Sequence, residues 1–244
     1  EAEIDAALAA AVDPADVARA YEAAAASPLW RALDAPGGVQ FAWDAHSTYL
    51  RRPPFVQAGR PAPLAGVARA LLVLGDDMTT DHISPAGQIG ADSETGRYLI
   101  GMGEDPADLN VHASRRGNFE SMIRGAFTNR LVKNTLAPGA PAGFTRHEPS
   151  GEIVPLTEAA HRYAGDGVPL VIVAGERYGM GSSRDWAAKA VALLGVKAVL
   201  AASFERIHRT NLIGMGVVPL VLPAGVTPLS LAIGPGASFR IDLD

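Results

Sequence analysis

An apolar stretch, a glycine-rich turn and an alanine-rich stretch follow one another in this chain and constrain its fold most. Residues 168–174 read V-P-L-V-I-V-A, the β-branched pattern of a strand that is buried on both faces. Residues 185–194 are rich in Ala and Leu and end at Gly195, which predicts a helix with a glycine C-terminal signal. A second β-branched strand is expected at 197–201. Together they predict a parallel, right-handed βαβ unit and therefore an α/β domain.

The turn between that strand and that helix carries glycines, two hydroxyls and a guanidinium. Gly179 and Gly181 lead into Ser182, Ser183 and Arg184. A glycine turn that opens a helix directs backbone N–H groups and the positive end of the helix dipole at one spot. These residue types therefore predict a binding site for a carboxylate or a phosphate.

Several kinds of chemistry compete for this turn. A P-loop requires a lysine that is missing here, and a nucleophile elbow requires G-x-S-x-G, which M-G-S-S-R does not supply. Ser182 or Ser183 acting as a base is a further alternative, if the N–H groups and Arg184 stabilise its alkoxide. From the residues alone the prediction stops at an anion-binding α/β domain.

Composition and charge exclude several other classes of protein. A formal net charge of -5 disfavours a general binder of nucleic acids or membrane surfaces. Apolar runs stay below the roughly 18 residues that span a bilayer, and the acidic start 1–12 is unlike a secretory signal. The chain has no cysteine, which excludes disulfides and a cysteine-ligated metal cluster on this chain. We expect a cytoplasmic protein and, since the chain begins without Met, a fragment or a processed product.

Residues 1–65 are expected to form a linker arm, and residues 66–244 a compact domain. Two Ala-rich helices are predicted at 3–12 and 14–26, with Asp13 as the N-cap of the second. Scattered aromatics and prolines then follow without a sustained period, typical of an extended arm that lies across a partner surface. A surface linker without a role in chemistry is the competing interpretation.

The compact domain is expected to alternate strands and helices, with two segments of functional interest. The polar turn 75–86 gathers side chains that either cap their own backbone or orient a substrate; they are Thr79, Thr80, Asp81, His82 and Ser84. A metal site is poorly supported there, because one Asp and one adjacent His give only two ligands. Residues 87–107 are expected to be loop-like, with Arg97, Tyr98 and Met102 most able to touch a ligand. The remaining predicted elements are strands at 67–74, 217–222 and 239–243, a short helix within 118–127, and helices at 155–165 and 203–214 capped by Thr157 and Ser203.

A basic segment follows at 109–147, where Glu120 is the one acidic residue. Its cations suggest a positive field that steers an anionic ligand, an RNA-contact surface, or arginines that pair with carboxylates of a neighbouring domain. They are Arg115, Arg116, Arg124, Arg130, Lys133 and Arg146.

Several long motifs, in order and over essentially the whole chain, resemble the C-terminal swivel domain of the aconitase superfamily. They are G-D-D-M-T-T-D-H-I-S-P-A-G at 75–87, S-R-R-G-N at 114–118, R-G-A-F-T-N at 124–129, Y-G-M-G-S-S-R-D-W-A-A-K at 178–189 and S-F-E-R-I-H-R-T-N-L-I-G-M-G-V-V-P at 203–219. The likeness is closest to the branch of long-chain bacterial aconitases and iron-regulatory proteins. The stretch S-T-Y-L-R-R-P-P-F at 47–55 resembles the linker of that family. The resemblance implies a layered β/β/α swivel domain that contains the parallel βαβ unit.

The same resemblance implies a hydro-lyase that interconverts citrate and isocitrate through cis-aconitate. It implies Ser182 as the catalytic base, Ser183 and Arg184 as the pair that holds a substrate carboxylate, and Asp81 and His82 as members of the catalytic network. The family's 4Fe–4S cluster is held by cysteines, so it must be ligated outside this chain. The implied partners are cluster-bearing N-terminal domains or a large subunit, together with a small polycarboxylate substrate.

One position departs from the family pattern. Met102 stands where aconitases carry an arginine that contacts the distal carboxylate of the substrate. Either the substrate is altered, 2-methylisocitrate or another substituted analogue, or Arg97, Arg115 or Arg116 takes over. An RNA-binding regulatory module and an isolated anion-binding module without catalysis are the rival readings.

Overall fold

The computed structural model describes residues 1–34, 37–54, 66–148 and 150–241. Contacts divide the chain into two units, Glu1–Ala42 and Trp43–Asp244. The second unit thus begins before residue 66, since residues 43–54 already belong to it. The expected boundary at 65/66 borders residues 55–65, which lie outside the described ranges, and it stays a prediction.

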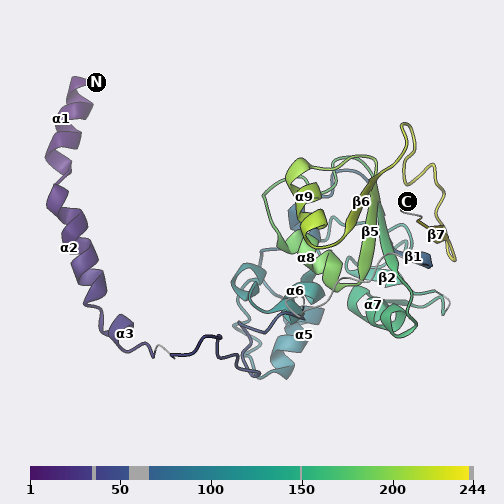
Figure 1. Ribbon diagram of the computed structural model, residues 1–244, viewed down its shortest axis with the longest axis horizontal. Helices are drawn as coiled ribbons and strands as arrows, with labels where there is room; N and C mark the ends of the chain where they lie inside the picture. The colour runs from purple at the N-terminus through teal and green to yellow at the C-terminus, as the bar shows by residue number, and fades with distance from the viewer. Residues whose placement is uncertain (35–36, 55–65, 149, 242–244) are drawn as a thin grey trace. The chain divides into compact units, whose positions relative to one another are not determined.

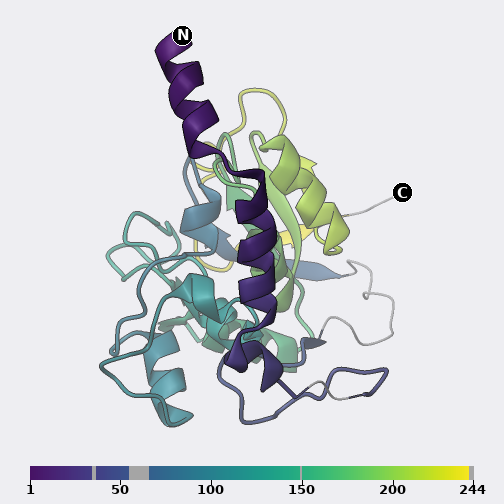
Figure 2. The ribbon, with the colours of Figure 1, turned by 90° about the vertical axis from the view of Figure 1, so that its left-hand side faces the viewer.

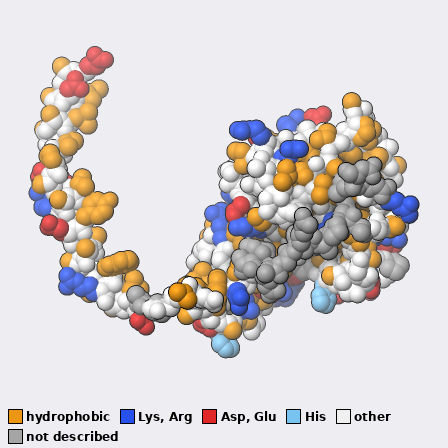
Figure 3. Space-filling view, viewed as in Figure 1, with side chains coloured by type: hydrophobic (Ala, Val, Ile, Leu, Met, Phe, Trp, Pro, Cys, Tyr) orange, Lys and Arg blue, Asp and Glu red, His pale blue; other side chains and the backbone are white. Residues whose placement is uncertain are grey.

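In its described residues the first unit contains three helices, α1 (Ala2–Ala11), α2 (Pro14–Ala25) and α3 (Pro28–Arg31). The two long helices confirm the sequence prediction, and the Asp13 carboxylate accepts a hydrogen bond from the N–H of Ala15 at 2.9 Å. None of the residues in these three helices is buried. Apolar side chains are consequently exposed to solvent along the unit (Figure 3). No described helix has the length and apolar character that a membrane crossing requires.

The second unit is built on a five-stranded sheet in the order β6-β5-β4-β1-β7. The first four strands of that order are parallel, and β7 pairs antiparallel with β1. A separate antiparallel pair joins β2 to β3. The bounds are β1 (Val67–Val73), β2 (Phe144–Arg146), β3 (Ile153–Pro155), β4 (Leu170–Ala174), β5 (Val196–Ala201), β6 (Val218–Val221) and β7 (Ser238–Arg240).

Helices connect the parallel strands, as the sequence predicts for an α/β fold. Helix α8 (Trp186–Leu193) joins β4 to β5, and α9 (Arg206–Gly214) joins β5 to β6 (Figures 1 and 2). The predicted parallel βαβ unit is therefore confirmed. The long connection from β1 to β4 contains α4 (Thr80–Ile83), α5 (Glu94–Gly101), the 3₁₀ turn η2 (His112–Arg115), α6 (Phe119–Gly125) and α7 (Leu156–Gly165).

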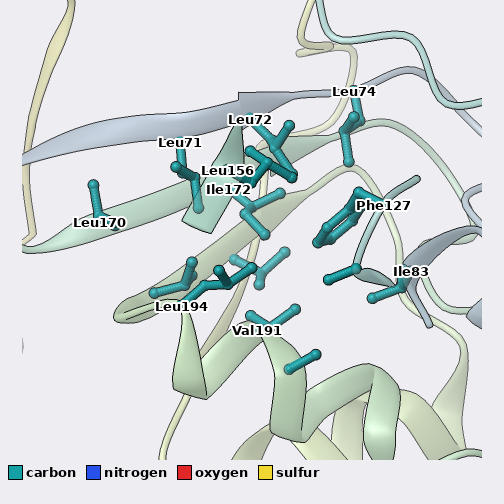
Figure 4. Close-up of a cluster of buried hydrophobic side chains, with 14 of the residues drawn as sticks. Leu71, Leu72, Leu74, Ile83, Phe127, Leu156, Leu170, Ile172, Val191 and Leu194 are labelled. Atoms are coloured by element: carbon teal, nitrogen blue, oxygen red, sulfur yellow. The ribbon is translucent and has the colours of Figure 1, made fainter. Parts of the chain in front are cut away.

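The larger core lies between the sheet and its helices. Leu71 and Ile172 point from β1 and β4 toward Val191 of α8, with Phe127 beside them (Figure 4). Because side chains alternate along a strand, Val171 and Val173 of β4 face the opposite side of the sheet, where they belong to a smaller apolar cluster. Strand β4 is buried along its whole length, which explains its continuous β-branched sequence.

Three local expectations are wrong. The stretch 87–107 is not all loop, since it contains α5, whose Ser93 hydroxyl accepts the N–H of Gly96 at 2.9 Å. Two glycines within that helix weaken its sequence signal, but Gly96 packs closely against the carbonyl of Gly90, where a side chain would not fit. Ser203 and Thr157 are not N-caps; Ser203 serves the turn after β4, and the Thr157 hydroxyl donates to Glu94.

Candidate anion-binding site

Two loops run side by side beyond the carboxyl ends of the paired strands β1 and β4. Loop 75–84 follows β1, and loop 175–184 follows β4. Backbone hydrogen bonds continue the pairing of the two strands into the loops, from Asp77 N to Glu176 O at 2.9 Å, Gly179 N to Met78 O at 2.6 Å and Thr80 N to Met180 O at 2.9 Å. Ligands of parallel α/β sheets bind at this end of the strands.

The glycine-serine turn is fixed by its backbone and leaves its hydroxyls exposed. The Thr80 hydroxyl donates to the carbonyl of Ser182 at 2.7 Å. Gly181 adopts φ +101°, a left-handed conformation that other residues rarely adopt. The side chains of Ser182 and Ser183 both lie at the surface. These two neighbouring serines therefore both present their hydroxyls at the surface.

Arg184 is held on one side only. Its Nη1 donates to the Ser84 carbonyl at 3.1 Å and forms an ion pair with the Asp81 carboxylate at 2.6 Å, so both partners lie at this one nitrogen. Within the described residues, Nε and Nη2 have no protein partner. The free edge of the guanidinium matches the two oxygens of a carboxylate.

Asp81 and His82 have different roles in this structure. Asp81 orients Arg184. His82 closes a capping box, in which its Nδ1 accepts the N–H of Thr79 at 3.1 Å and the Thr79 hydroxyl accepts the N–H of His82 at 3.2 Å. Because Nδ1 accepts this hydrogen bond, Nε2 is the ring nitrogen that carries a proton. The backbone-capping interpretation of this polar turn is therefore correct for Thr79 and His82.

Aromatic side chains pack together beneath the turn. Tyr178 is fully buried, and its ring lies 6.0 Å from Phe204 and 5.2 Å from His208 between centroids. Burial raises the pKa of Tyr178 and lowers the pKa of His208 to about 4. The Ser203 hydroxyl accepts the N–H of Arg177 at 2.8 Å, which ties the start of the turn to the end of β5.

Arg115 is enclosed by protein partners in this structure. Its side chain is 0% exposed, and it pairs with Glu104 at 3.0 Å and stacks over Tyr49 at 3.9 Å. It also donates to the carbonyls of Thr48 and Leu109. The expectation that Arg115 binds substrate is a poor fit to this geometry, because every N–H of the guanidinium already has a protein acceptor.

Met102 and Arg116 lie outside the assembled turn. Met102 is the C-cap of α5 and is half-buried, and Arg116 is exposed directly after η2. In the described ranges no hydrogen bond or ion pair joins either residue to loops 75–84 and 175–184. The structure brings together Asp81, His82, Ser182, Ser183 and Arg184, but not these two.

Three of the six cations in the basic segment 109–147 pair with carboxylates of their own domain. Arg115 pairs with Glu104, Arg124 with Glu120 and Arg146 with Glu148. A continuous positive field over this segment is therefore weaker than its sequence suggests. Among the described residues there is no group of three or more His, Asp or Glu side chains that could hold a metal ion.

Contacts between the two loops were missed by sequence reasoning. The Asp76 carboxylate accepts the N–H of Glu176 at 2.7 Å, and Asp77 forms a two-pronged ion pair with Arg177. The adjacent acidic residues Asp76 and Asp77 after β1 were a sequence signal that this loop makes polar contacts. Its partners lie 100 residues away, and a single sequence does not identify them.

Comparison with known proteins identifies the family. Residues 95–225 match the model of the aconitase C-terminal domain. Aconitate hydratase A of Pseudomonas aeruginosa is 53% identical over 216 residues, covering 87% of this chain and 24% of that protein. Phosphinomethylmalate isomerase of Streptomyces viridochromogenes is 47% identical over 244 residues, covering 98% of this chain and 27% of that protein. The chain thus spans about a quarter of the length of the curated relatives it matches.

A solved structure is also similar. The 3-isopropylmalate dehydratase of Methanocaldococcus jannaschii is 25% identical, with 64% of this chain and 60% of that chain covered. Its TM-score of 0.33 is too low to compare the two folds in detail.

Proposed function

The chain belongs to the aconitase family as its C-terminal domain, and on that premise we propose that it binds and deprotonates a tricarboxylic acid within a hydro-lyase. The reaction removes water from citrate or isocitrate and adds it back to cis-aconitate. This chain would supply the base and one carboxylate clamp. Its partners would be cluster-bearing domains or a large subunit.

The free edge of Arg184 is the observation that carries this proposal. Asp81 and the Ser84 carbonyl occupy Nη1 and hold the guanidinium plane in place. Nε and Nη2 then offer two parallel N–H donors to a substrate carboxylate, with the Ser183 hydroxyl next to them in the chain. Pre-orientation of the guanidinium lowers the entropy that binding would otherwise cost.

Ser182 is the residue that we propose as the base. Its main chain is fixed by the hydrogen bond from Thr80, while its hydroxyl is exposed and free to meet a carbon-bound proton. The Arg184 guanidinium two residues on and the start of α8 four residues on would favour a negative alkoxide at Ser182. His82 keeps an Nε2–H that can donate to substrate, although its Nδ1 is committed to the backbone.

An iron–sulfur cluster does not fit this chain's own residues. The chain has no cysteine, and the described residues contain no three-ligand group of His, Asp or Glu. In the proposed enzyme a 4Fe–4S cluster would therefore be ligated by other domains. Every role assigned above belongs to side chains of this chain.

The exact substrate is a separate proposal, and Met102 bears on it. A thioether at the end of α5 cannot give the charge-assisted hydrogen bond that an arginine would give, and Arg115 is not available to replace it. One similar protein is named for a phosphinomethylmalate rather than for aconitate. A substituted analogue such as 2-methylisocitrate is therefore the alternative to citrate and isocitrate.

Two serine variants test the proposal in the enzyme assembled with its cluster-bearing domains. We expect Ser182→Ala to lower kcat by about 10²–10⁴, because a positioned base contributes that much, while substrate still binds. Ser183→Ala should mainly raise KM, because it removes a hydrogen bond to the bound carboxylate. Near-normal turnover of Ser182→Ala would refute the assignment of the base. If the wild-type assembly binds tricarballylate but turns over no substrate, the chain is an anion-binding module without catalysis.

A further inference from the structure

Beneath the serine turn, His208 of α9 is pressed against a glycine. The histidine is only 1% exposed. A Cβ placed on Gly179 would fall 2.5 Å from the Cβ of His208 and closer still to its Cγ and Cδ2. The imidazole thus occupies the space that any side chain at position 179 would need. Gly179 also adopts φ +83°, so both its conformation and its surroundings require glycine.

The turn is gripped from two sides at this position. On one side the N–H of Gly179 donates to the Met78 carbonyl at 2.6 Å, and Thr79 bridges to Met180. On the other side the ring of His208 supports the glycine, three residues before Ser182. The contact between His208 of α9 and Gly179 therefore fixes the position of the turn.

His208 is an unusual choice for a mere filler of the core. Within the described residues, neither of its ring nitrogens has a hydrogen-bond partner, and burial keeps the ring neutral. A buried polar group without a partner costs stability, so an aliphatic side chain would pack at lower cost. A five-membered ring is flat and small, and such a shape lets the glycine backbone approach closely.

We propose that His208 is a positioning residue, which acts through Gly179 to set where the Ser182 hydroxyl and the Arg184 guanidinium lie. This inference rests on the proposed function of the turn. His208 itself does not touch substrate. Its contribution is to hold the turn in the position from which the Ser182 hydroxyl can reach the carbon-bound proton of the substrate.

Four variants of the full chain test this role. His208→Ala leaves space below the turn, His208→Phe overfills it, and Gly179→Ala forces a methyl group into the ring. Gly179→Ala with His208→Ala removes the two nearest ring atoms from that clash. Arg209→Ala is the control, because Arg209 is the exposed neighbour of His208 on α9.

In the assembled enzyme we expect His208→Ala and His208→Phe to lower kcat about 100-fold with KM changed less than about threefold, as a displacement near 1 Å would. In a crystal structure of the same assembly, residues 178–184 should be displaced in both variants and not in Arg209→Ala. The double variant should lose less activity than the product of the two single losses.

The proposal is overturned if the His208 variants melt earlier but keep the kcat of wild type per folded molecule. A turn found in its wild-type position in these variants would overturn it as well. Failure of the proposed function has a different signature, which is normal turnover of Ser182→Ala. The position of the turn in the variant structures can be compared whichever way that experiment falls.

Discussion

Arg115 and Arg116 are adjacent arginines that the structure treats in opposite ways. Arg115 is wholly enclosed, with Glu104 and the backbone of two segments around its guanidinium. Arg116 is exposed and makes no ion pair within the described part of the chain. Replacing each with Gln therefore compares a buried cation with a surface cation of the same sequence context.

The expected cost of Arg115→Gln follows from what the change leaves behind. Glu104 is 22% exposed and would lose its cation, and the Leu109 carbonyl would lose two donors. Breaking a buried pair by removing one partner costs about 3–5 kcal/mol, and we take about 3 kcal/mol because Glu104 reaches water. For a chain of this size each kcal/mol lowers Tm by about 2–4 °C, so Tm should fall by about 6–12 °C.

Thermal and urea unfolding of the 244-residue chain measures this difference. Arg116→Gln should change the free energy of unfolding by less than about 0.5 kcal/mol, as surface substitutions do. If Arg115→Gln instead unfolds like Arg116→Gln and raises the KM for substrate, Arg115 is a substrate ligand and the structural role given to it here is wrong.

Three further outcomes are expected. Burial lowers the pKa values of His112 and His208 to about 4, below the ordinary 6.5 of an unfolded chain. The folded state therefore prefers the neutral rings. The free energy of unfolding is highest above about pH 6.5 and falls between about pH 6.5 and 4. Each ring accounts for a loss of about 3 kcal/mol at most over that range. Urea unfolding across that range checks this, and His208→Leu should flatten the pH dependence. Asp81→Asn should weaken tricarballylate binding about tenfold, because Arg184 loses the anion that orients it; calorimetry that finds unchanged affinity would contradict this. Met102→Arg should favour citrate and isocitrate over their methyl-substituted analogues by about tenfold, since it restores a charge-assisted hydrogen bond. An unchanged preference in the assembled enzyme would show that Met102 does not determine specificity.

The candidate site was partly visible in the sequence, because some of its properties are local. Ser182, Ser183 and Arg184 follow a buried strand and precede a helix, so their gathering at a helix start depends only on neighbours in the chain. The open edge of Arg184 was not visible. It depends on Asp81 and Ser84, which lie about 100 residues away on another loop.

Sequence by itself determined the parallel βαβ unit, the two long N-terminal helices with the Asp13 cap of the second, and the family, because β-branched runs, cap residues and long motifs report directly on local structure. Only the tertiary structure decided which polar residues stay exposed at the turn and which are enclosed by protein partners. It enclosed Arg115 with Glu104, committed His82 to a backbone cap and pressed His208 against Gly179. The physical reason is that the role of a charged or polar side chain depends on its burial and its partners. Those are set by packing between segments far apart in the chain, whereas the pattern of strands and helices is written in the order of neighbouring residues.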